Sequence, residues 1–416
     1  MNLLCRFALA VALVLCASGR ASAQTSDDFF NPDVLQRVEI WLNDSDWSKL
    51  KAAFQENTYY PADVTWNGQT VYNVGIRSRG LGSRSGTKPG LRVDFDKYST
   101  SQTFLGLKSF VLDNLTQDHS GIKETVVMRF FTRMGIPAPR ETHTRLYING
   151  KYAGLYGLVE SVDKTMMGRV FGSIGDNVQN DGYLFEYNYV IGSPWRFQYE
   201  GSDLAAYKAR FDIKTNESKS DSTIWGPIEE FVRLVNSTDS ALYEQTLGSR
   251  IDLPAFIRYI AVQNFVAQDD GFNGYDGMNN FYMYRLEDST KHVFIAWDED
   301  NAFLQPDFQI TTRLDDNALT RKTVNLSAYS SQYFSVLQEA ASSAADWLQQ
   351  EMQRQLTMIT AAMQEDTLKP YTNAEHVAAR DAILAFPTAR ITYVRCEVAK
   401  ALGTTRPAGC PASAGQ

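Results

Sequence analysis

The order of the hydrophobic patterns along the chain constrains the fold more than any other feature of this sequence. Strand-like patterns fill most of the first third, and helix-like patterns dominate after it. The expected strands cover residues 38–42, 63–66, 70–77, 91–95, 144–148, 153–160, 281–285 and 293–297. The expected helices cover residues 44–54, 122–134, 224–236 and 252–268, and a helical region continues from about residue 330 to Leu402. Because strands and helices are largely segregated, we predict an α+β fold.

Two Asn-Gly pairs mark tight turns between expected strands. Asn67-Gly68 lies in the first third of the chain, and Asn149-Gly150 follows the helix expected at 122–134. Asn-Gly is the strongest short-range indication of a two-residue hairpin, because both residues of that turn take a positive φ. We therefore predict one β-hairpin on each side of this helix.

The first 23 residues have the three parts of a secretory leader. Arg6 supplies a positive charge, residues 7–17 are apolar, and Ala21-Ser22-Ala23 offers a small-residue cleavage site. We expect cleavage before Gln24 and export to the periplasm or the extracellular space. No other apolar run reaches about 18 residues, so we expect no membrane span.

Charge and cysteine content narrow the classes of partner and compartment. The net charge of −8 excludes a general affinity for nucleic acid or an anionic membrane. After removal of the leader, Cys396 and Cys410 are the two cysteines that remain. Outside the cytoplasm they can pair, and the loop that they close would stabilise the fold by about 3 kcal/mol.

A basic, glycine-rich segment stands out in this acidic chain. Between residues 77 and 88, Arg77, Arg79, Arg84 and Lys88 alternate with glycines and hydroxyl side chains. Glycines let backbone N–H groups approach an anion, and basic side chains neutralise its charge. The segment therefore indicates a phosphate site, and a solvated hairpin tip is an equally good explanation from these residues alone.

Two acidic segments follow rigid elements later in the chain. Asp269-Asp270-Gly271 ends a long apolar helix and leads to Asn279-Asn280, and Asp298-Glu299-Asp300 ends a short apolar strand. Mg²⁺ phosphate chemistry needs one or two carboxylates for the metal, and phosphoryl transfer adds one more aspartate to orient the hydroxyl. Ordinary polar turns are the alternative. A calcium loop fits poorly, because its twelfth position would be Asn280 instead of glutamate.

In these segments the chain resembles the CotH family of atypical secreted or spore-coat kinases. The residues that carry the resemblance lie between about 38 and 303. They are Arg77-x-Arg79-Gly80, Lys88-Pro89-x-x-Arg92-Val93-Asp94-Phe95, Phe104-Leu105-Gly106-Leu107-Lys108, Asp118-x-Ser120-x-Ile122-Lys123, Met134-Gly135-Ile136-Pro137, Tyr147-Ile148-Asn149-Gly150-x-Tyr152-x-Gly154-Leu155-Tyr156, Asp270-Gly271, Asn280-Phe281-Tyr282-Met283-Tyr284 and Trp297-Asp298-x-Asp300-x-x-Phe303. One departure is Glu186, where family members often carry lysine.

The resemblance implies a reduced, two-lobed protein-kinase plan that uses ATP and Mg²⁺ to phosphorylate a protein hydroxyl. The substrate protein stays open. The implied roles are catalysis by Asp270, metal binding by Asp298, Asn280 and Asp300, phosphate contacts from Arg77, Arg79, Lys88 and Arg92, and a nucleotide contact from Glu160 at the hinge.

The implied domain covers residues 24–320, with a first lobe at about 36–160 and a second from about 161. Residues 321–402 would be a helical part of the same domain, and 403–416 a tail. Two other functions stay open at this point. One is a non-catalytic surface or matrix binding protein that keeps the fold, and the other is a metal-dependent phosphoester hydrolase.

Overall fold

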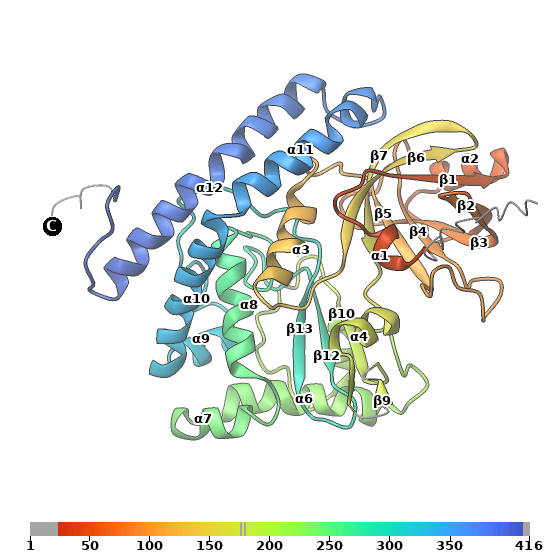
Figure 1. Cartoon of the computed structure of the whole chain (residues 1–416). Helices are drawn as coiled ribbons and strands as arrows, with labels where there is room; N and C mark the ends of the chain where they lie inside the picture. Colours follow the sequence, from red (N-terminus) through yellow and green to blue (C-terminus); the bar gives the residue numbers. More distant parts are fainter. Residues whose placement is uncertain (1–23, 175–176, 179, 411–416) are drawn as a thin grey trace, which may run out of the picture.

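The computed structural model describes residues 24–174, 177–178 and 180–410, and it has the predicted α+β character. The predicted leader, residues 1–23, lies outside this range. A β-barrel forms from the first part of the chain, and a larger mixed part with most of the helices follows it (Figure 1). Within the described residues, none of the helices combines the length and hydropathy that a membrane crossing requires.

The barrel closes because its first strand pairs with a strand far along the chain. Its strand order is β1-β2-β3-β4-β5-β7-β6, and β1 pairs with β6 in parallel, with Val38 opposite Leu146. The strands are β1 (Gln36–Leu42), β2 (Tyr60–Trp66), β3 (Gln69–Arg79), β4 (Gly90–Asp94), β5 (Ser109–Asp113), β6 (Glu141–Ile148) and β7 (Lys151–Glu160). Short helices α1 (Ser26–Phe29) and α2 (Asp44–Ala52) flank it. Phe29, Trp66 and Phe110 pack edge to face inside it.

Both predicted hairpins are confirmed. Asn67 and Gly68 have φ of 45° and 79°, and Asn149 and Gly150 have φ of 50° and 76°. Two consecutive residues with positive φ are what a type I′ turn requires, and Asn-Gly adopts them with little strain. The first turn joins β2 to β3, and the second joins β6 to β7.

The second part of the molecule packs helices around a small sheet of order β11-β10-β12-β13. Its strands are β10 (Tyr183–Tyr187), β11 (Phe211–Ile213), β12 (Phe281–Arg285) and β13 (His292–Ala296), and a separate pair is β8 (Ser173–Ile174) and β9 (Asn177–Val178). The helices are α3 (Lys123–Arg133), α4 (Lys164–Phe171), α5 (Leu204–Arg210), α6 (Asp221–Ser237), α7 (Ser240–Leu247), α8 (Leu253–Phe265), α9 (Ala318–Val324), α10 (Ser327–Ala345), α11 (Leu348–Glu365) and α12 (Asn373–Ala401).

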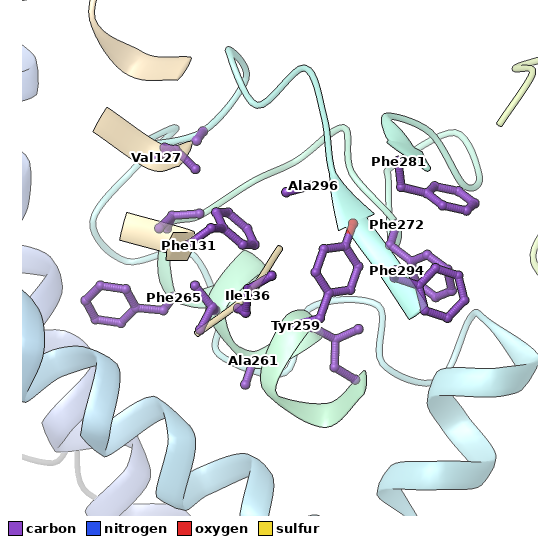
Figure 2. Close-up of a cluster of buried hydrophobic side chains, with 14 of the residues drawn as sticks. Val127, Phe131, Ile136, Tyr259, Ala261, Phe265, Phe272, Phe281, Phe294 and Ala296 are labelled. Carbon is purple, nitrogen blue, oxygen red and sulfur yellow. The ribbon is translucent and has the colours of Figure 1, made fainter. Parts of the chain in front are cut away.

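The core of this second part is rich in aromatic side chains. Figure 2 shows Phe131 of α3, Tyr259 of α8 and Phe294 of β13 gathered with other apolar residues. Phe272, from the loop after α8, packs against Phe281 and Phe294 with ring centroids 5.1 and 4.9 Å apart. These contacts fix the loop and the two strands that carry the acidic segments.

The structure adds elements that the sequence pattern did not indicate. Strand β5 was not expected, and the polar stretch 164–221 contains helices α4 and α5 and strands β10 and β11. The expected helical region after residue 330 is confirmed as α10 to α12. The expected disulfide between Cys396 and Cys410 is also confirmed, and it ties the end of α12 to the segment after it.

Candidate active site

A polar cleft of about 570 Å³ lies where the barrel, the small sheet and the two acidic segments meet. One wall comes from β3 and the loop after it, and a second from β10 and β11. The third side comes from the loop after α8 and the segment after β13. The residues that line it are Asn57, Arg77, Arg79, Gly80, Leu81, Gly82, Arg84, Gln117, Glu186, Tyr187, Asn188, Tyr189, Asp212, Lys214, Asp270, Tyr275, Asn279, Asn280, Phe281, Trp297, Asp298, Asp300 and Asn301.

Neutral groups hold two of the arginines on the barrel wall. Arg77 donates to Asn57 Oδ1 at 2.9 Å and to the Tyr59 hydroxyl at 3.1 Å. Arg84 donates to the same Asn57 oxygen at 2.6 Å and to the carbonyl oxygen of Gly80 at 2.7 Å. Within the described part of the chain neither guanidinium has a carboxylate partner, so both charges are open to an anion.

Arg79 completes this basic wall and contacts the acidic side of the cleft. Its guanidinium lies 3.9 Å from Asp113 and stacks over the Trp297 ring, 5.4 Å from the centroid. Burial, followed by repulsion from Arg77 and Arg79, lowers the pKa of Arg84. A phosphate group bound between these arginines would relieve that repulsion.

Asp298 and Asp300 form the most strongly perturbed acidic pair in the cleft. Asp298 directly follows Trp297 at the end of β13 and has a φ of 53°, which is uncommon for a residue other than glycine. Burial raises the pKa of Asp298 to about 6, and Arg79 acts in the opposite direction. Burial and the neighbouring Asp298 raise the pKa of Asp300 well above its usual value. A cation between the two carboxylates would remove their mutual repulsion.

Asp270 lies in the loop after α8 and is held by two asparagines. Asn279 donates to Asp270 Oδ2 at 3.2 Å, and Asn280 donates to the Asp270 backbone oxygen at 3.0 Å. Asn280 has a φ of 55° immediately before β12. Burial raises the pKa of Asp270, while the hydrogen bond from Asn279 lowers it. Asp270 is also among the charges that raise the pKa of Asp298, so the two carboxylates act on one another.

Two further carboxyl groups, Glu124 at the start of α3 and Glu141 at the start of β6, add to the same acidic region. Burial is the main cause that raises the pKa of both groups well above the usual value. The charge of Asp298 contributes to both shifts. Sequence reasoning missed this pair, because Glu124 and Glu141 belong to elements that meet Asp298 only in the folded chain.

The residues of the candidate metal site fit Mg²⁺ with bound phosphate better than a metal held by protein alone. In residues 24–174, 177–178 and 180–410, no group of three or more His, Cys, Asp or Glu side chains could hold a metal ion. Asp298 and Asp300 nevertheless offer two carboxylates, and Asn280 offers an amide oxygen. Mg²⁺ commonly takes one or two carboxylates and completes its shell with phosphate oxygens and water.

A lysine that directly follows the neighbouring strand β11 lies beside Glu186. Lys214 Nζ is 2.5 Å from Glu186 Oε2, and both residues line the cleft. Strand β11 pairs with β10, which places the segment that contains Lys214 beside Glu186. Lys214 Nζ is also 3.8 Å from Asp212 Oδ2, so two carboxylates already pair with this ammonium group.

The structure does not bring three of the expected site residues to the cleft. Lys88 is buried with its Nζ 2.7 Å from Asp366, and Arg92 donates to Asp94 at 2.9 Å. Glu160 is buried and accepts hydrogen bonds from Arg140 at 2.6 Å and from Arg169 at 2.5 Å. Lys88, Arg92 and Glu160 therefore do not line the cleft, and each is paired with an oppositely charged side chain of the protein. Arg77, Arg79, Asp270, Asn280, Asp298 and Asp300 do come together there.

The sequence pattern of the family described as CotH kinase protein matches residues 76–394. The chain belongs to the CotH kinase protein family. The matched span contains the arginine wall and both acidic segments. Inner spore coat protein H of Bacillus subtilis (strain 168) is a CotH relative, 22% identical over 274 residues, which cover 65% of this chain and 69% of that protein.

Two solved kinase structures overlap with this chain at low similarity. The Helicobacter pylori proinflammatory kinase CtkA has 9% identity and a TM-score of 0.31, covering 71% of this chain and 92% of that one. The Golgi casein kinase with Mn/ADP bound has 9% identity and a TM-score of 0.29, covering 88% and 75%.

Proposed function

We propose that this chain is an exported kinase of the CotH family that transfers the ATP γ-phosphate to a protein hydroxyl with Mg²⁺. One observation carries the proposal: a single cleft combines arginines free of carboxylate partners with half-buried aspartates, and burial raises the pKa of Asp298 to about 6. Phosphoryl transfer depends mostly on positioning and charge stabilisation, and this combination supplies both.

The arginine wall would hold the phosphate groups of the nucleotide. Arg77 and Arg84 share Asn57 as an acceptor, so their guanidinium planes are fixed near one another. Arg79 lies between that wall and the acidic side of the cleft. A fixed guanidinium can bind two phosphate oxygens at once, which orients the γ-phosphate as well as attracting it.

The acidic side of the cleft would have two functions, metal binding and acceptance of the hydroxyl proton. Asp298, Asp300 and Asn280 would hold Mg²⁺, which when bound neutralises the phosphate oxygens. Asp270 would accept the proton of the attacking hydroxyl while the oxygen forms its bond to phosphorus and ADP leaves. Hydrogen bonds from Asn279 and Asn280 fix Asp270 for this role.

Export rests on features outside the cleft. The leader-like residues 1–23 and the disulfide between Cys396 and Cys410 both suit an oxidising compartment. The Bacillus subtilis relative is named as an inner spore coat protein. We propose that the acceptor is a protein met outside the cytoplasm.

Transfer of labelled γ-phosphate from MgATP to a generic acceptor protein tests the function. We expect incorporation by the unmodified chain and a loss of about 10²–10⁴-fold in Asp270→Asn. Asp269→Asn is the matched control, because it makes the same chemical change one residue away. Asp269 pairs with Arg313, which also donates to the backbone oxygens of Asp269 and Asn273.

The assay also separates the other two functions. Binding of MgATP without transfer would favour a non-catalytic binding protein. Release of phosphate from a simple phosphoester, without transfer to protein, would favour a hydrolase. Equal transfer by the unmodified chain and by Asp270→Asn would contradict the proposed role of Asp270.

A further inference from the structure

Glu299 lies between the two candidate metal ligands but does not line the cleft. Its side chain is fully buried, at 0% exposure. Asp298 and Asp300, its chain neighbours, both line the cleft. A buried carboxyl group in this position needs hydrogen-bond partners for both oxygens, because a buried polar group without partners is destabilising.

Two glutamine amides provide those partners. Gln263, in α8, donates from Nε2 to Glu299 Oε1 at 2.9 Å. Gln268, in the turn after α8, donates from Nε2 to Glu299 Oε2 at 2.7 Å. Since each carboxylate oxygen accepts an amide N–H, the geometry favours a structural role for Glu299 over a third metal ligand.

The other end of each amide holds the loop that contains Asp270. Gln268 Oε1 accepts the Asp270 backbone N–H at 3.1 Å, and Gln263 Oε1 accepts the Phe272 backbone N–H at 3.2 Å. These two N–H groups lie on either side of Gly271. A side-chain carbon on Gly271 would come within 2.6 Å of Gln263 Nε2, so only glycine fits there without a shift.

These contacts connect the two acidic segments by two parallel paths. Each path runs from the Glu299 carboxylate through one glutamine amide to one backbone N–H of the Asp270 loop. Glu299 is itself bonded through the chain to Asp298. Four hydrogen bonds therefore link the Asp270 loop to the residue next to Asp298: two end on the Glu299 carboxylate, and two end on the backbone N–H groups of Asp270 and Phe272.

We propose that Glu299 is a positioning residue that fixes Asp270 relative to Asp298 through Gln263 and Gln268. The inference rests on the proposed function, in which Asp298 holds the metal and Asp270 accepts the proton of the hydroxyl. Transfer needs these groups in one geometry, and a misplacement of about 1 Å can cost about 100-fold in rate. Nucleotide binding does not need the Asp270 loop to the same degree.

The chemistry of the pairing gives a sharp test. Only a carboxylate at position 299 accepts from both glutamines while their oxygens stay on the backbone N–H groups. Glutamine at position 299 has nearly the same shape as glutamate, but its own NH₂ group would face the NH₂ group of Gln263 or Gln268. We expect this variant to lower kcat by about 10–100-fold and to leave the affinity for MgATP within about twofold.

A compensating variant separates positioning from general damage to the fold. Glu299→Gln combined with Gln263→Glu restores the hydrogen bonds that connect Glu299 to the Asp270 loop, because the new carboxylate at position 263 accepts from the amide introduced at position 299 and still accepts the Phe272 N–H. The Tyr259 hydroxyl, which accepts from Gln263 Nε2 at 3.1 Å, can donate to the new carboxylate instead. Gln263→Glu alone places two carboxylates face to face and should also lower kcat. We expect the double variant to recover to within about threefold of the unmodified chain.

Hydrogen exchange gives a readout that does not require activity. We expect the amide protons of Asp270 and Phe272 to exchange faster in Glu299→Gln, and to return to the original rate in the double variant. If the unmodified chain transfers no phosphate, the proposed function fails. Faster exchange in Glu299→Gln would still support the hydrogen-bonded connection from Glu299 to the Asp270 loop. Unchanged exchange and unchanged kcat in Glu299→Gln would overturn the inference, as would a double variant no better than its two parents.

Discussion

Lys88 Nζ lies 2.7 Å from Asp366 Oδ2, and both side chains are almost completely buried. Lys88 also donates to the Leu155 backbone oxygen at 2.8 Å, and Asp366 accepts the Leu155 N–H at 3.1 Å. Through these contacts, Lys88 at the end of the basic segment 77–88 is held against Leu155 of strand β7 and against Asp366, which directly follows α11. The lysine that the sequence suggests as a phosphate ligand therefore forms a buried ion pair away from the cleft.

We expect Lys88→Met to destabilise the fold without a direct effect on nucleotide binding. Removal of the ammonium leaves Asp366 as an unpaired buried charge, which typically costs about 3–5 kcal/mol. Urea unfolding would measure the free energy. Lys108→Met is the matched control, since Lys108 is 54% exposed and 3.4 Å from Asp96, and such surface pairs contribute about 0–1 kcal/mol. Equal losses in the two variants would contradict the role given to Lys88.

Arg79→Gln should weaken MgATP binding while leaving the fold stable. Loss of one charge-assisted contact to phosphate corresponds to about 1.5–3 kcal/mol, or about 10–150-fold in affinity. Arg37→Gln provides a comparison on the barrel, because Arg37 pairs with Glu39 and stacks on Tyr147 outside the cleft. Unchanged affinity in Arg79→Gln would show that the basic wall does not contact the nucleotide.

His292 should make the fold sensitive to acid. Burial lowers the pKa of His292 to about 3, so the folded state binds fewer protons than the unfolded state below the ordinary value of 6.5. Its contribution to stability is therefore lost as the pH falls below 6.5, by about 1.4 kcal/mol per pH unit. His292→Asn keeps a donor for the Arg250 backbone oxygen. As the pH falls from about 6 to about 4, the unfolding free energy of this variant should decrease less steeply than that of the unmodified chain, by about 1.4 kcal/mol per pH unit. An unchanged slope would contradict this assignment.

Reduction of the disulfide between Cys396 and Cys410 should destabilise the fold by about 3 kcal/mol or less. The bridge closes a loop of sequence separation 14, so its effect on the unfolded chain is moderate. Thiol titration of the unfolded, unreduced protein after export should find no free thiol on these two residues. Two free thiols in protein recovered from outside the cytoplasm would contradict the pairing.

The sequence predicted most strands, helices and tight turns of this fold, because each of them depends on residues that are close together in the chain. The Asn67-Gly68 turn and the strand before Asp298 depend on neighbours in the sequence, and both are present. Barrel closure depends on parallel pairing of β1 with β6, which no local pattern encodes. Strand β5 was missed because its apolar run, Phe110-Val111-Leu112, is too short to be assigned by periodicity.

The candidate site likewise contains residues that local sequence predicts and residues whose environment depends on distant parts of the chain. Asp270, Asn280, Asp298 and Asp300 follow rigid elements, so their sequence context indicates where they project. The environment of Lys88 depends on α11, which arrives from the far end of the chain, and the partner of Glu186 comes from the segment after β11. The role of Glu299 depends on two glutamines whose importance appears only when hydrogen-bond partners are known.

Titration of MgATP into the unmodified chain, Asp298→Asn and Asp270→Asn tests the central claim most directly. We expect Mg²⁺-dependent binding by the unmodified chain, affinity weakened by at least about tenfold in Asp298→Asn, and nearly unchanged affinity in Asp270→Asn. This pattern would place the metal at Asp298 and leave Asp270 for the transfer step. Absence of MgATP binding by the unmodified chain would contradict the account.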